Sequence, residues 1–231
     1  MSDAFPFDSS PTRLPSLKPP YRLLVAISGG GTTLRNLLAA IDAGHLPAEV
    51  VHVISSRDDA GGLAYAEAAG IDASVLPRSR YESADDYAVD FFSLARESAA
   101  DLVILAGFLA HVGIPTDFRH RVLNIHPSLI PAFAGKGYYG LRVHRAVLER
   151  GCRISGCTVH FVDDEYDHGP IVDQQAVPVH PDDTPETLAA RVFEAECELF
   201  PAAIRSIAEG GLEVVERRVQ PVVEATDHDS A

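Results

Sequence analysis

Short apolar runs alternate with amphipathic segments through the first half of the chain. The runs predict strands at residues 22–27, 50–54, 73–76, 102–106 and 122–125. The run at 102–106 shows no polar alternation, which is typical of a parallel strand covered on both faces. Apolar residues at helical spacing predict helices at 32–43, at 62–69 and in a segment ending near residue 99. This order predicts an open, doubly wound α/β sheet of mostly parallel strands.

The second half of the chain changes in character. Two apolar runs, 155–162 and 171–179, flank a turn that contains Asp167, Gly169 and Pro170, so we expect a hairpin-like, mixed portion of the sheet there. A last helix should begin with Thr184 as its N-cap, and Pro201 should kink or interrupt it.

Domain organisation follows from the same pattern. The chain has 231 residues, 46% of them hydrophobic, which is enough for one substantial core. We expect an irregular extension rich in proline and serine over residues 1–20, a single domain over 21–223 and an acidic tail over 224–231.

Net charge, hydropathy and cysteine usage limit the expected partners and the expected location of the protein. The formal net charge of −14 disfavours nucleic acid, because binding to a polyanion depends on clustered cations. No apolar run reaches membrane-spanning length, so no membrane contact is expected. The three cysteines match no zinc or redox spacing, and no secretion signal precedes them, which favours reduced thiols in a cytoplasmic protein.

A glycine run follows the first predicted strand. Gly29, Gly30 and Gly31 open a helix whose exposed amides and dipole favour an anion, and Thr32 and Thr33 add hydroxyl groups. The run matches neither the dinucleotide fingerprint nor the Walker loop. A phosphate site is favoured over the alternative, a tight turn that needs positive φ.

Two polar residues mark the end of the strand at 122–125. Alternation along the strand places Asn124 and His126 on one face, and Pro127 ends the strand and fixes the direction of His126. Polar groups projecting together into a crevice are costly to bury without partners. They favour a functional site over the alternative, in which both side chains satisfy loop backbone.

The acidic turn after the next strand is open to several interpretations. Asp167 could cap an Asx-turn, and its neighbours Asp163, Asp164 and Glu165 are best explained as a solvated turn. The acidic spacing is not that of an EF-hand, so no metal is expected. Two further histidines, His144 and His160, stay ambiguous, and His160 fits a hydrogen-bonded core position equally well.

Taken together, the motifs resemble the folate-dependent formyltransferases. The resemblance covers about residues 22–212 and rests on the segments 27–32, 105–109, 124–131, 135–137, 158–162, 167–170 and 190–201. It implies a Rossmann-like fold, 10-formyltetrahydrofolate as cosubstrate, small-molecule substrates and no metal. Within the family, the segments best match members that formylate the amine of glycinamide ribonucleotide in purine biosynthesis. A homodimer is left open.

The resemblance also implies roles for individual residues. It makes Asn124, His126 and Asp167 the catalytic trio. The implied nucleotide site consists of Gly30, Gly31, Thr32, Thr33, Pro127 and Glu196. The implied folate pocket is formed by Leu105, Leu109, Ala110, Val112, Val162, Asp163 and Asp164.

Three departures and two alternatives accompany the resemblance. Ala110 replaces a frequent arginine, Arg142 stands where some members have histidine, and His168 stands where many have glycine. The alternatives are a formyltetrahydrofolate hydrolase, and a non-catalytic module on the same scaffold that binds a nucleotide or folate.

Overall fold

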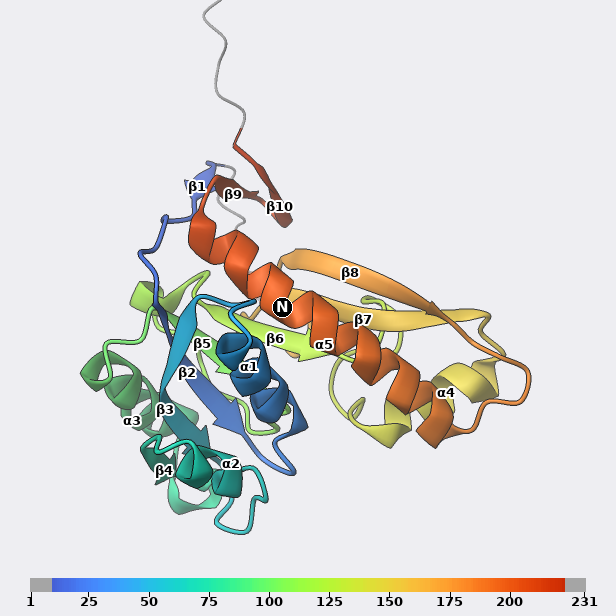
Figure 1. The fold of residues 1–231 in the computed structure, drawn as a ribbon, viewed down its shortest axis with the longest axis horizontal. Coiled ribbons are helices and arrows are strands. Elements are labelled where there is room, and N and C mark those ends of the chain that lie inside the picture. The colour runs from blue at the N-terminus through green and yellow to red at the C-terminus, as the bar shows by residue number, and fades with distance from the viewer. Residues whose placement is uncertain (1–9, 223–231) are drawn as a thin grey trace, which may run out of the picture.

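A single sheet runs through the described part of the protein (Figure 1). The computed structural model describes residues 10–222, so the predicted acidic tail at 224–231 lies outside the described residues. Ten strands pair in the order β1-β9-β10-β8-β7-β6-β5-β2-β3-β4. The predicted α/β class with a mixed C-terminal portion is confirmed.

The parallel half of the sheet contains every strand predicted in the first half of the chain. Its strands are β2 (Tyr21–Ile27), β3 (Ala48–Ser55), β4 (Ala73–Val75), β5 (Leu102–Leu105) and β6 (Val122–His126). The helices between them are α1 (Thr32–Asp42), α2 (Leu63–Ala68) and α3 (Ala84–Glu97), and short 3-10 turns lie at η1 (Arg78–Arg80) and η2 (Thr116–Phe118).

The other half of the sheet is mostly antiparallel. Strand β7 (Ile154–Phe161) pairs antiparallel with β6 and with β8 (Ile171–Pro178), as the hairpin pattern predicted. A C-terminal hairpin, β9 (Leu212–Val215) and β10 (Arg218–Pro221), was not predicted. Within the extension expected to be irregular, Thr12–Arg13 form β1, which satisfies its backbone groups on the edge of β9.

Two apolar layers enclose the sheet. On one face Leu23, Val25 and Ile27 of β2 pack with residues of α1 and α5, and on the other face Leu24 and Ala26 pack with α3. Successive residues of β2 therefore point alternately into the two layers, as expected for a strand covered on both faces. On α3, Tyr87, Phe91 and Phe92 are fully buried, whereas Leu94 is only half-buried.

Two helices depart from the predictions. Helix α4 (Leu141–Arg150) was not predicted. The last helix, α5 (Pro185–Glu209), begins with the expected Thr184 cap, but the expected interruption at Pro201 is wrong. Pro201 has no N–H to donate to the Cys197 carbonyl, and Asn36 of α1 donates to this carbonyl instead, at 3.1 Å. This replacement bond lets the helix continue.

Across residues 10–222, none of the helices has both the length and the apolar character needed to cross a membrane.

Candidate active site

Two polar side chains project from the end of β6. Asn124 is half-buried and His126 is 4% exposed, and both lie on the same face of the strand. Strand β6 pairs parallel with β5 and antiparallel with β7, so the parallel and antiparallel halves of the sheet meet at this strand. The register places Asn124 opposite His160 and His126 opposite Thr158.

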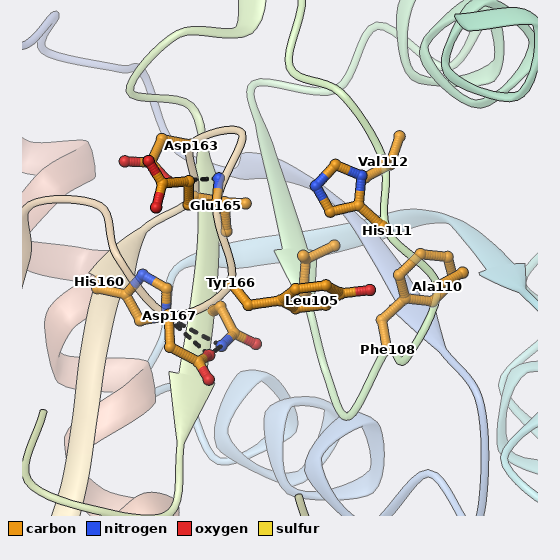
Figure 2. Close-up of a pocket in the computed structure, with 12 residues that line it drawn as sticks. Leu105, Phe108, Ala110, His111, Val112, His160, Asp163, Glu165, Tyr166 and Asp167 are labelled. Atoms are coloured by element: carbon orange, nitrogen blue, oxygen red, sulfur yellow. Dashed lines mark hydrogen bonds and ion pairs between the residues drawn. The ribbon is translucent and has the colours of Figure 1, made fainter. Parts of the chain in front are cut away.

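The Asp167 carboxylate joins these side chains from the loop between β7 and β8. Its Oδ1 accepts a hydrogen bond from Asn124 Nδ2 at 3.4 Å and lies 3.7 Å from His160 Nε2. Its Oδ2 accepts from the Gly135 N–H at 2.8 Å and lies 3.4 Å from His126 Nδ1. Asn124, His126 and Asp167, which only the family resemblance linked, therefore meet in space (Figure 2 shows Asp167 beside His160).

The two ring nitrogens of His126 face two acceptors. Nε2 lies 2.9 Å from the Phe133 carbonyl, and Nδ1 faces the carboxylate of Asp167. A neutral ring can donate to only one of these acceptors, whereas the imidazolium donates to both. Burial lowers the pKa of His126, and the negative charge of Asp167 acts in the opposite direction. An additional negative charge nearby would therefore favour the protonated ring.

Asp167 is held as a carboxylate. Burial by itself would raise the pKa of Asp167. The neighbouring His160 and His126 rings, in their protonated forms, and the Gly135 N–H outweigh this effect, so the pKa lies below its ordinary value. The site therefore pairs an ionised carboxylate with a histidine whose charge depends on its surroundings.

His160 belongs to this network rather than only to the core. Its ring is 1% exposed, and Nδ1 lies 2.8 Å from the Phe161 carbonyl. With the proton on Nδ1, the Nε2 lone pair accepts from Asn124 Nδ2 at 3.0 Å and so orients the amide. The sequence left this residue ambiguous, because its position opposite Asn124 depends on the register of two strands that are distant along the chain.

Two cavities meet at the network. The larger has a volume of about 840 Å³, and the smaller, shown in Figure 2, about 70 Å³. Asn124 and Asp167 line both cavities, and His126 lines the larger one. Tyr166, which the sequence analysis did not single out, also lines both. A group bound in one cavity would therefore lie beside a group bound in the other.

The predicted binding residues divide between the two cavities. The larger is lined by Thr32, Thr33, Leu109, Pro127 and Glu196. The smaller is lined by Leu105, Ala110, Val112, Val162 and Asp163. Gly30, Gly31 and Asp164 line neither cavity.

Two titratable side chains on helices face the larger cavity. His144 of α4 is 4% exposed, and its buried Nδ1 has no hydrogen-bond partner among residues 10–222. Glu196 of α5 is half-buried, and burial raises its pKa to about 8. The sequence analysis left His144 ambiguous, because its position on the cavity wall depends on the docking of a helix that the sequence did not predict.

Two carboxylates of the acidic turn, Asp163 and Asp164, have hydrogen-bond partners within the protein. Asp163 Oδ1 accepts from the Glu165 N–H at 3.0 Å, and Asp163 Oδ2 lies 2.7 Å from His168 Nδ1. Asp164 Oδ1 accepts from the Ile114 N–H at 3.3 Å. Within residues 10–222, no group of three or more His, Cys, Asp or Glu side chains is arranged to hold a metal ion.

The glycine turn before α1 has the positive φ that the tight-turn interpretation requires, and its amides are not capped by a side chain. Gly31 caps the helix with φ of 69°, and no side chain caps the amides at this end. A Cβ on Gly31 would lie 2.4 Å from the Gly62 Cα, so the turn requires glycine for its conformation and for its packing. Thr32 and Thr33, directly after the turn, face the larger cavity.

We therefore expect Gly31→Ala to destabilise the protein by about 2 kcal/mol or more, because a side chain is strained at positive φ and collides with backbone. Gly30→Ala is the matched control, since a Cβ there meets nothing within 4 Å. Thermal or urea unfolding of both variants measures the difference. Equal stability of the two variants would contradict the packing argument.

Comparison with known proteins identifies the class that this fold and site define. The sequence model of the Formyl transferase family matches residues 21–204, and the chain belongs to this family. It is 41% identical over 191 residues to the chloroplastic phosphoribosylglycinamide formyltransferase of Arabidopsis thaliana, an alignment covering 81% of this chain and 65% of the relative. It is 37% identical over 196 residues to the phosphoribosylglycinamide formyltransferase of Haemophilus influenzae, covering 83% of this chain and 89% of the relative.

A solved structure agrees with these relatives. Glycinamide ribonucleotide transformylase 1 from Symbiobacterium toebii superposes with a TM-score of 0.81 at 42% identity, covering 88% of this chain and 94% of that chain. The chain spans just under two thirds of the length of the plant relatives that it matches.

Proposed function

We propose that the chain transfers the formyl group of 10-formyltetrahydrofolate to the amine of glycinamide ribonucleotide, a step of purine biosynthesis. The observation that carries the proposal is the meeting of Asn124, His126 and Asp167 where two cavities join. Two cavities suit two substrates, and the polar groups lie where the substrates would touch. The names of the relatives point to the nucleotide acceptor, and the family resemblance points to the folate donor.

The chemistry that the site must support is the attack of an amine on a formamide. A bond forms between the amine nitrogen and the formyl carbon, and the carbonyl oxygen takes up negative charge. Donors aimed at this oxygen lower the barrier, and the loss of one such donor typically costs about 3–4 kcal/mol. The tetrahedral centre then releases the folate nitrogen, which takes a proton.

Asn124 and His126 are the proposed donors. The contact from Asn124 Nδ2 to Asp167 is the longer of its two hydrogen bonds, 3.4 Å against 3.0 Å to His160, so a substrate oxygen can replace it. A negative oxygen beside the His126 ring adds to the effect of Asp167 and favours the imidazolium. Donation to the oxygen would thus strengthen as its charge develops.

Asp167 is the proposed group for proton transfer. Its pKa lies below the ordinary value, so at neutral pH it is ionised and can accept a proton from the attacking amine through water. The same proton can pass to the folate nitrogen as it leaves. This route needs no covalent intermediate on the protein.

The larger cavity is the proposed nucleotide site. The amides of the turn at Gly30 and Gly31, with the hydroxyls of Thr32 and Thr33, would hold the phosphate at the uncapped start of α1. In the same site, Pro127 would contact the substrate and Glu196 would accept hydrogen bonds from the ribose hydroxyls.

The smaller cavity is the proposed folate site. The proposed folate residues on its wall are Leu105, Ala110, Val112, Val162 and Asp163. Leu109 lies on the adjoining wall of the larger cavity, and Asp164 braces the segment at 111–114 by accepting from the Ile114 N–H. The small Ala110 side chain leaves contacts at its position to the backbone.

One assay separates the proposal from its alternatives. The purified chain is mixed with 10-formyltetrahydrofolate, and the absorbance of the released tetrahydrofolate is followed with and without glycinamide ribonucleotide. We expect release only when the nucleotide is present, and none with glycinamide lacking the ribose phosphate. Release without nucleotide would indicate the hydrolase, and no release at all would indicate a binding module.

We extend the proposal to location and assembly. The net charge of −14 and three free cysteines, Cys152, Cys157 and Cys197, support a cytoplasmic protein with small-molecule substrates and no nucleic-acid partner. The oligomeric state stays open between a monomer and a homodimer, and sedimentation of the purified chain distinguishes the two. The proposed single domain covers residues 21–223, between the extension at 1–20 and the tail at 224–231.

A further inference from the structure

The loop that carries Asp167 is held in an unfavourable conformation. Asp167 has φ of 54°, in the left-handed region that non-glycine residues rarely adopt. Such a residue keeps its conformation only when its surroundings hold it there. A Cβ on the nearby Gly169 would lie 1.9 Å from the Phe161 carbonyl oxygen, so the loop is also packed tightly against β7.

One side of the loop is fixed through His168, the residue after Asp167. Asp163 Oδ2 lies 2.7 Å from His168 Nδ1, which places the proton on this nitrogen. His168 Nε2 then offers a lone pair, and Arg217 Nη1 donates to it at 2.6 Å. Arg217 Nη2 also donates to the backbone carbonyl of His168. The guanidinium thus holds both the side chain and the backbone next to Asp167.

Arg217 is supplied by a separate part of the chain. It lies in the turn of the β9–β10 hairpin, C-terminal to the residues that the family model matches. Strand β10 pairs in parallel with β8, with Arg218 opposite Ile171, at the point where the loop enters β8 (Figure 1). The backbone pairing therefore fixes the base of the hairpin, and with it Arg217, relative to the loop.

The opposite side of the loop is fixed by other contacts. The Asp164 carbonyl lies 2.9 Å from His111 Nε2, and its carboxylate accepts from the Ile114 N–H. Asp167 lies between these two attachments. Releasing Arg217 would leave the His168 end of the loop held by the Asp163 contact and by the packing of Gly169.

We propose that Arg217 is a positioning residue for the reaction, which acts through His168 to hold the Asp167 carboxylate against Asn124 and His126. The proposal rests on the function proposed above for Asp167.

The test compares Arg217→Ala with Arg218→Ala, a matched control that removes an exposed arginine from the same hairpin. We expect Arg217→Ala to lower kcat about 5- to 30-fold and to change KM for glycinamide ribonucleotide less than about 2-fold. Arg217→Lys should recover part of kcat, because it restores one donor, and Arg218→Ala should match the unmodified protein. Normal kcat in Arg217→Ala, or an equal loss in both alanine variants, would overturn the proposal.

Two further measurements test the positioning role of Arg217, and the first of them does not depend on the proposed function. Hydrogen exchange of the peptide at 163–169 should be faster in Arg217→Ala than in Arg218→Ala, and unchanged exchange would overturn the proposal without reference to activity. In a double-mutant cycle on kcat, Arg217→Ala should cause a smaller loss in His168→Gly than in the unmodified protein, because only the bond to the backbone carbonyl is then left to remove. Fully additive losses would show that Arg217 does not act through the His168 side chain. Asp167→Asn, assayed alongside, separates the two failures, because normal turnover in that variant refutes the role of Asp167 itself.

Discussion

Replacing Asp167 with asparagine is expected to lower kcat for formyl transfer by about 10²- to 10⁴-fold, with KM for both substrates changed only several-fold. Asparagine keeps the size of the side chain but removes the negative charge and the proton acceptor. The Asp167 carboxylate accepts hydrogen bonds from both the Gly135 N–H and the Asn124 amide. The asparagine amide would instead place a donor against one of these two donors. Steady-state kinetics with binding measured in parallel tests the prediction.

The matched control for Asp167 is Asp173→Asn. Asp173 is an exposed carboxylate on β8, so its replacement removes the same charge without touching the network. We expect normal kcat in this variant. His126→Ala should show a loss of about 10²- to 10³-fold, as expected for the removal of one donor to the developing oxyanion. Near-normal turnover in either Asp167→Asn or His126→Ala would refute the assignment of the site.

Replacing Glu196 with glutamine is expected to stabilise the unliganded protein at alkaline pH and to weaken nucleotide binding. Burial raises the pKa of Glu196 from 4.5 to about 8. The folded chain therefore retains a proton that the unfolded chain has lost, and stability falls as the pH rises from about 4.5 to about 8. Above this window the ionised carboxylate destabilises the fold by on the order of 2–4 kcal/mol, and glutamine removes the penalty.

Thermal unfolding at pH 6 and pH 9 measures the effect of Glu196. We expect the gain in Tm of Glu196→Gln over the unmodified protein to be about 5–10 °C larger at pH 9 than at pH 6. Glu194→Gln, which changes an exposed carboxylate on the same helix, should show no such pH dependence. A gain that is the same at both pH values would mean that the carboxyl is not penalised by burial.

The elements that the sequence predicted well are those with a local signal. The apolar runs of the parallel strands and the Thr184 cap of α5 depend on neighbouring residues, and both were found as expected. Helix α4 was missed although its sequence carries a local signal, because Val143 and Val147 lie one helical turn apart on its buried face. The continuation of α5 through Pro201 was not predicted, because the compensating donor, Asn36, comes from another helix.

The residues of the site likewise divide into those with a local sequence signal and those placed by contacts between distant segments. Alternation along one strand was enough to place Asn124 and His126 on one face. No periodicity predicts that Asp167 reaches them, and this link came only from the resemblance of the motifs. The contacts of His160 and Arg217 depend on strand register and on hairpin docking, which a single sequence does not specify.

Strand β6 is shared by the parallel and antiparallel halves of the sheet, and this has a consequence for how the protein loses activity. Asn124 and His126 extend from the shared strand, while the groups that orient them come from β7 and from the loops that follow β6 and β7. Partial opening of the antiparallel half would separate these partners while the parallel half remained folded. Inactivation can therefore precede global unfolding, and activity then reports on the integrity of the antiparallel half of the sheet.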